Sequence, residues 1–171
     1  APADLEASLV AAIEQARSTR SFVGRDAVLC LGSPQLHVQN IRVAKVAASQ
    51  FAGAVREEAA SRLPFPLAEA ELRYLEASDV RQGDELKREV ILLACHRPVL
   101  DAHLAIIERA GLRPVAVDAE PVALLRCFNR QFRRESDQQV CLMLVHIGAA
   151  STVVVVARGG KALFIKYLDI S

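Results

Sequence analysis

The sequence predicts a mixed α/β fold in which short apolar strands alternate with amphipathic helices. Two observations predict it: apolar runs of strand length end at Gly, Pro or polar clusters, and segments of helical periodicity separate them. Over residues 36–120 the predicted order is β-α-β-β-α-β, which is the ferredoxin-like pattern or a close relative of it. Because this pattern recurs with many functions, it predicts an architecture and leaves function to particular residues.

The N-terminal part is expected to begin with a helix over residues 4–19, because Leu5, Leu9 and Ile13 share one helical face. The apolar run AVLCLGSP at 27–34 follows, and Gly, Ser and Pro stop it. A bounded run of this kind is typical of a buried strand.

The middle of the chain alternates in type. Residues 36–43 alternate as a strand does, and 44–63 place Phe51, Val55 and Ala59 on one helical face. The segment PFPL then breaks this helix, since each proline lacks an amide donor and restricts the residue before it.

The next elements follow from the same criteria. In chain order the prediction is a strand at 70–77, a polar turn at 78–85, a strand at 87–96, a helix at 97–111, a strand at 113–120 and a helix at 121–132. In the first of these strands Leu72 and Tyr74 face one way, and Glu71 and Arg73 face the other. The strand at 113–120 either completes the β-α-β-β-α-β unit or belongs to a neighbouring sheet, and the pattern leaves both open.

After a polar link at 133–139, two or three strands close the chain, with the sequences VCLMLVHI, STVVVVAR and KALFIKYL. The dipeptide Gly159-Gly160 separates the last two and is typical of a tight hairpin turn.

Composition excludes several classes of protein. The 171 residues fit one domain or two small ones, and a content of 52% hydrophobic and 24% charged residues predicts a folded, soluble chain. A net charge of +1 provides no electrostatic footprint for nucleic acid. No apolar run reaches the roughly 18 residues of a membrane span, so the chain is expected in the cytosol.

Cysteine and histidine spacing argues against a metal site. The cysteines lie apart in apolar runs, without a CxxC pair, and we expect buried free thiols at Cys30, Cys95, Cys127 and Cys141. The histidines are likewise scattered without ligand spacing, at positions His37, His96, His103 and His146.

The turn in LMLVHIGAASTVVVV (142–156) is the first feature that could carry chemistry. Consecutive backbone N–H groups of a Gly-containing turn can bind phosphate, and Ser151 and Thr152 could add hydroxyl donors. A plain hairpin between core strands explains the same residues, and composition alone favours the hairpin.

The second feature is VDAEPVALL (117–125), where a strand ends and a helix begins. Asp118 and Glu120 lie at the carboxyl end of this strand, where an acid could position water for attack on a phosphate. Acidic residues also stabilise the N-terminus of a helix through its dipole, and Pro121 suits a first turn. The sequence alone favours this structural role.

Three segments in order make the chain resemble the PilM family, actin-like cytoplasmic proteins of type IV pilus assembly. They are LPFPLAEAELRYLEA (63–77), EVILLACHRPVLDAHLAIIERAGLRPVAVDAEPVALLR (89–126) and LVHIGAASTVVVVARGGKALFIKYL (144–168). The cell-division protein FtsA and the cytoplasmic domain of the secretion protein GspL share this scaffold and are near alternatives.

The resemblance implies a partial actin-like, ribonuclease-H-like fold with an inserted subdomain. The implied divisions are part of a first actin-like subdomain at 1–35, the inserted small subdomain at 36–112, a return strand and connecting helix at 113–135, and the start of a second subdomain at 136–171. The chain is then expected to be the interior piece of a longer protein.

The resemblance also implies roles for the two features. Glu120 takes the position of the residue that orients water in active members, and the second phosphate loop is represented by His146, Gly148, Ala149, Ala150, Ser151 and Thr152. His146 stands where the family's metal-associated Asp is expected, and Mg²⁺ prefers oxygen ligands. Two loop glycines are replaced by alanine. We therefore expect no enzyme activity, no metal and no cofactor in this chain, while ATP and Mg²⁺ binding stays open for a longer parent.

The partner that the resemblance implies is the cytoplasmic N-terminal segment of a PilN-like inner-membrane protein. In the family its groove lies between the first and the inserted subdomains, but no residues of this sequence can be assigned to it. The expected role is a scaffold at the inner-membrane face, held there through partners and able to self-associate. The alternatives are a fragment of an active actin-like ATPase, a GspL-like secretion domain, and an unrelated α/β domain.

Overall fold

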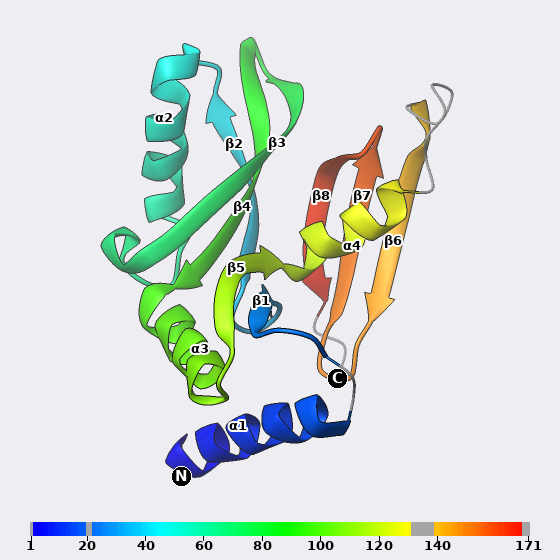
Figure 1. The fold of residues 1–171 in the computed structure, drawn as a ribbon. Coiled ribbons are helices and arrows are strands. Elements are labelled where there is room, and N and C mark those ends of the chain that lie inside the picture. Colours follow the sequence, from blue (N-terminus) through cyan, green and yellow to red (C-terminus); the bar gives the residue numbers. More distant parts are fainter. Residues whose placement is uncertain (1, 20–21, 131–138, 169–171) are drawn as a thin grey trace.

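The computed structural model describes residues 2–19, 22–130 and 139–168, and it arranges three small sheets side by side (Figure 1). The helices and strands follow one another in the predicted order. For convenience, the first lobe denotes β1, β5 and α4 with the loop after β1, the insert denotes β2, α2, β3 and β4, and the second lobe denotes β6, β7 and β8.

The first lobe contains a two-stranded parallel sheet made from β1 (Asp26–Leu31) and β5 (Arg113–Ala119). Helix α4 (Glu120–Asn129) follows β5 directly, with Pro121 in its first turn. The N-terminal helix α1 (Pro2–Thr19) packs on α3 (Arg97–Arg109), and Arg17 donates a hydrogen bond to the carbonyl of Ala110, the residue that follows α3.

The insert is an antiparallel sheet of order β2-β4-β3, formed by β2 (His37–Ala44), β4 (Glu85–His96) and β3 (Ala70–Gln82). Helix α2 (Ala48–Ala60) covers one face, and a short 3₁₀ turn (Leu67–Glu69) precedes β3. The β-α-β-β-α-β order is confirmed. Of the two places left open for its last strand, β5 takes the second, because it leaves the insert and pairs in parallel with β1.

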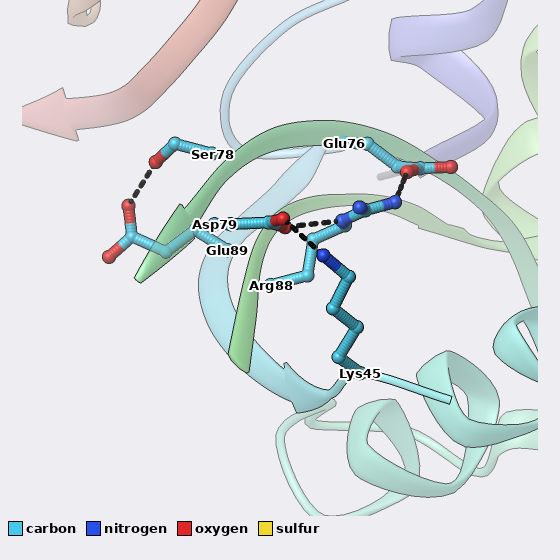
Figure 2. A network of polar contacts seen from close by, with 6 residues as sticks. All are labelled: Lys45, Glu76, Ser78, Asp79, Arg88 and Glu89. Atoms are coloured by element: carbon cyan, nitrogen blue, oxygen red, sulfur yellow. Dashed lines mark hydrogen bonds and ion pairs between the residues drawn. The ribbon is translucent and has the colours of Figure 1, made fainter. Parts of the chain in front are cut away.

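The predicted polar turn at 78–85 is wrong, because β3 continues to Gln82 and only Gly83 and Asp84 form the turn. Figure 2 shows the reason: the charged residues pair across the hairpin. Arg88 of β4 donates to Asp79 at 2.8 Å and to Glu76 at 2.5 Å. Lys45 reaches the other oxygen of Asp79 at 2.7 Å. Cross-strand ion pairs therefore extend a segment whose composition is that of a turn.

The second lobe is an antiparallel sheet of order β6-β7-β8, with β6 (Cys141–Ile147), β7 (Thr152–Arg158) and β8 (Lys161–Leu168). The hairpin turn at Gly159-Gly160 is confirmed, and both glycines have positive φ, of 53° and 78°. Helix α4 lies across this sheet and contacts β7 (Figure 1). Most of the polar link predicted at 133–139 lies outside the described residues.

Two apolar cores hold the chain together. One lies between α2 and the insert sheet and contains Phe51, Val55, Val90 and Leu92. The other joins all three sheets and includes Leu31, Ile91, Leu93, Leu144, Val155 and Ile165. The lobes therefore share one continuous interior.

The expectation of four buried thiols is wrong for three of them. Only Cys95 is buried, while Cys30, Cys127 and Cys141 are exposed, and all four are free. Their apolar neighbours misled the prediction, because in a strand every second residue points away from the core. Across the ranges that the structure describes, no helix is both long and apolar enough to cross a membrane.

Candidate functional site

The predicted phosphate-loop turn joins β6 to β7 and is a four-residue hairpin loop over 148–151. Ile147 pairs with Thr152 at its base, and the Gly148 N–H donates to the Ser151 carbonyl at 2.9 Å. This amide is therefore engaged within the turn. Ala149 and Ala150 are exposed, and neither has positive φ, so the alanines cause no backbone strain in this conformation.

Glu120 is the first residue of α4 and faces the second lobe. Its Oε2 accepts a hydrogen bond from the Tyr167 hydroxyl of β8 at 2.8 Å. Its Oε1 lies 3.4 Å from Nε2 of His146 on β6. The structure therefore brings together two of the predicted site residues, and both carboxylate oxygens of Glu120 have side-chain neighbours from the other lobe.

Gly32, in the loop after β1, packs against the same carboxylate. A Cβ atom added at Gly32 would lie 2.7 Å from Glu120 Oε2, which is closer than real Cβ contacts. The absence of a side chain is therefore what allows Glu120 to sit beside this loop. We call the four residues Gly32, Glu120, His146 and Tyr167 the clasp.

Sequence reasoning missed Gly32 and Tyr167. The only signal for Gly32 was its place where an apolar run stops, and Tyr167 alternates as an ordinary strand residue. Burial, together with its hydrogen bond to Glu120, raises the pKa of Tyr167 well above its usual value. The hydroxyl accordingly stays protonated and remains a donor to Glu120 at any physiological pH.

Asp118 has a different role from Glu120. Its carboxylate accepts a hydrogen bond from the Ala119 N–H at 2.8 Å. It also forms an ion pair with Arg126 of α4. This pairing raises the pKa of Arg126. Asp118 therefore links the end of β5 to α4 by an ion pair.

A groove lies between the insert and the first lobe. It encloses about 500 Å³ and is lined mainly by apolar side chains: Leu31, Leu36, Leu75, Leu93, Cys95, Leu100, Val117, Ala119 and Val122, with Glu71, Arg73 and Asp118 as the polar members. Burial raises the pKa of the Cys95 thiol, so it behaves as an apolar lining group.

The strands around the groove explain its shape. Glu71, Arg73 and Leu75 alternate along β3 and therefore share one face of the insert sheet. Three consecutive residues of β5, 117–119, line the opposite side. Both β3 and β5 are edge strands of their sheets. A groove lined mainly with apolar side chains, between the face of one sheet and a neighbouring strand, suits an extended peptide.

Among the described residues no group of three or more His, Cys, Asp or Glu side chains lies close enough together to hold a metal ion. The side-chain contacts of Glu120 with the second lobe are the hydrogen bond from Tyr167 and the approach of His146.

Comparison with known proteins places these features in context. A family model described as type IV pilus assembly protein PilM matches residues 6–169. A solved PilM-PilN type IV pilus biogenesis complex is similar over 96% of this chain, with 27% identity and a TM-score of 0.79. The cytoplasmic domain of EpsL, an inner membrane component of the type II secretion system of Vibrio cholerae, is similar in fold over 94% of the chain, with 14% identity and a TM-score of 0.58.

The chain spans about half the length of these solved proteins, covering 48% of the first and 56% of the second. The two together confirm the mixed α/β fold class that the sequence predicts.

Proposed function

The chain belongs to the PilM family of type IV pilus assembly proteins, and from that premise we propose that it is a non-catalytic docking module of the assembly machinery. The partner is the cytoplasmic N-terminal segment of a PilN-type inner-membrane protein. The observation that carries this proposal is the apolar groove between the insert and the first lobe. The similarity to a PilM-PilN complex supports the choice of partner.

The groove has the chemistry that a short extended segment requires. Its apolar lining can take up alternate side chains, while the edges of β3 and β5 offer backbone groups to a main chain lying between them. Glu71 and Arg73 carry opposite charges on one face of β3 and would accept a segment whose flanking residues are polar.

A role without catalysis is supported by the clasp. The carboxylate of Glu120, which would orient water in an active member, here accepts from the Tyr167 hydroxyl with one oxygen and faces His146 with the other. These contacts give it a structural role between the lobes. An imidazole at position 146 also offers Mg²⁺ a nitrogen where an oxygen ligand is preferred. We propose no cofactor for this chain; a longer protein that contains it could still bind ATP and Mg²⁺.

The proposed location is the cytoplasmic side of the inner membrane, reached through the docked partner. The family assignment and the similarity to proteins of pilus and secretion systems support this location.

A pair of valines on β5 allows a direct test of the groove. Val117 lines the groove and is 44% exposed, whereas Val115 lies outside it on the same strand and is 52% exposed. Val117→Lys would place an ammonium among apolar side chains. We expect it to weaken binding of a fluorescent peptide, made from the PilN-type protein's cytoplasmic N-terminal segment, by about tenfold or more.

Val115→Lys is the matched control and should bind within about twofold of the unsubstituted chain. Fluorescence anisotropy at fixed ionic strength measures both. Absence of binding by the unsubstituted chain at several hundred micromolar would contradict the proposed function. Equal affinities for the two lysine variants would show that the segment binds elsewhere.

A further inference from the structure

The groove and the clasp are built from the same two chain segments. Leu31 at the end of β1 and Leu36 in the loop after it line the groove, while Gly32 between them packs on Glu120. At the junction of β5 and α4, residues 117–119 line the groove and the next residue is Glu120 itself. Each segment therefore presents neighbouring residues to two different sites.

The junction between β5 and α4 is short and is held by polar contacts of Asp118. Asp118 is bonded both to the backbone at Ala119 and to Arg126, so the end of β5 and the first turns of α4 form one unit. Glu120 follows Asp118 by two residues, and consecutive Cα atoms are only about 3.8 Å apart, so the two residues lie close together. A shift of the groove wall at Asp118 is therefore expected to displace the backbone at Glu120, which carries the clasp carboxylate.

The second lobe contributes residues to the clasp but none of the described residues that line the groove. The described residues that line the groove come from the first lobe, the insert and α3, with none from β6, β7 or β8. The clasp, by contrast, ends on β6 at His146 and on β8 at Tyr167. The clasp is thus a physical connection between the groove wall and the second lobe.

We infer that docking of a segment in the groove and closure of the two lobes are coupled through the clasp. The inference rests on the proposed function and adds its regulation. In the structure the groove is formed while the clasp is engaged. The engaged clasp therefore favours the binding-competent groove, and by linkage a docked segment stabilises the clasp to the same extent.

The consequence is a signal that requires no nucleotide. Occupancy of the groove is transmitted to β8 by the hydroxyl of Tyr167 and the carboxylate of Glu120. A coupling of this kind needs two arrangements of one element. The structure shows the first, Glu120 engaged by Tyr167, and the inference requires a second in which this hydrogen bond is released.

Removal of one oxygen atom tests the coupling. Tyr167→Phe deletes the donor to Glu120, and we expect the peptide probe described above to bind the full chain about fivefold more weakly. Tyr74→Phe is the matched control, because Tyr74 packs beside Phe51 on the opposite face of the insert sheet. It should bind the peptide as the unsubstituted chain does.

Hydrogen–deuterium exchange distinguishes coupling from general loosening. In the unsubstituted chain and in Tyr74→Phe, the peptide should slow amide exchange both at 117–122 and at 164–168, although β8 does not line the groove. In Tyr167→Phe, bound peptide at saturation should protect 117–122 and leave 164–168 unchanged. Protection of β8 that persists without the hydroxyl would overturn the inference.

Gly32→Ala provides a second route if Tyr167→Phe folds poorly. Its added methyl group would lie 2.7 Å from Glu120 Oε2, the oxygen that accepts from Tyr167, so this oxygen must shift. The same loss of coupling is therefore expected with the tyrosine intact. Unchanged affinity in both clasp variants, with normal binding by the unsubstituted chain, would refute the coupling alone. No binding by the unsubstituted chain would instead refute the proposed function, and the inference with it.

Discussion

The two faces of the insert sheet have different surroundings, although the residues of both faces alternate along the same strands. One face packs against α2, where Val90 and Leu92 are completely buried and Tyr74 lies edge-on to Phe51, with 6.0 Å between ring centroids. The other face looks toward the first lobe across the groove, where Leu93 and Cys95 are also buried but border an open volume of about 500 Å³.

The difference shows how a sheet separates stability from recognition. Because neighbouring side chains point in opposite directions, a substitution on one face leaves the other largely unaffected. The face against α2 is filled and contributes to the free energy of unfolding. The face at the groove retains unfilled apolar surface, which is available to a partner.

The largest expected change in stability tests this difference between the two faces at two adjacent residues of β4. Leu92→Ala removes a side chain that is 0% exposed in the filled core and should lower the free energy of unfolding by about 2–5 kcal/mol. Leu93→Ala, at 7% exposure, borders the existing groove and should cost less, about 1–2 kcal/mol, while weakening peptide binding.

Urea unfolding and peptide anisotropy, measured on both variants, test the separation. If Leu92→Ala and Leu93→Ala lower the free energy of unfolding equally and weaken peptide binding equally, the two faces are not independent.

A smaller effect is expected where the insert meets the second lobe. The side-chain amide of Asn40 donates to Ile165 O at 2.7 Å and accepts from Ile165 N at 3.4 Å, so it satisfies the backbone at the free edge of β8. Asn40→Ala leaves these buried groups unpaired and should lower the free energy of unfolding by about 1–3 kcal/mol. Gln39→Ala, at the neighbouring position of β2, is the control, and a similar loss there would remove the special role of Asn40.

The smallest effect concerns the charged hairpin beyond the two faces (Figure 2). Hydrogen bonds from Arg88 and then Lys45 lower the pKa of Asp79 from 3.8 to about 2. A lowered pKa in the folded state means that the ionised carboxylate stabilises the fold above pH 4, and that this contribution is lost as the pH falls from about 4 to about 2. The network is exposed, so the effect is modest.

Asp79→Asn should therefore be slightly less stable than the unsubstituted chain at pH 6, and the difference should vanish near pH 2. Urea unfolding at a series of pH values measures this, with Asp84→Asn in the hairpin turn as the control. A difference that stays constant from pH 6 to pH 2 would contradict the role given to the Asp79 carboxylate.

Sequence reasoning was accurate where local rules decide the outcome. Helical periodicity and apolar runs of strand length predicted the four α-helices and the order of the strands, with two or three strands expected after residue 139, where the structure has three. The opposite orientation of Leu72 and Arg73 on β3 is confirmed. It was inaccurate where charges paired across strands, as at Asp79 and Arg88. The predicted division into subdomains, and the roles assigned to Glu120 and the 146–152 turn, stay predictions.

Other features depend on contacts between distant residues, and local pattern does not encode them. Neither the pairing of β5 with β1, nor the enclosure of Glu71 and Arg73 by a groove, follows from the residues beside them. The hydrogen bond between Glu120 and Tyr167 joins positions 47 residues apart, and it exists because three sheets pack around one core and Gly32 leaves space for the carboxylate. Periodicity and turn chemistry thus determined most of the helices and strands, and the resemblance of three sequence segments indicated the family. The packing of the sheets decided where the apolar groove lies and which residues link the lobes.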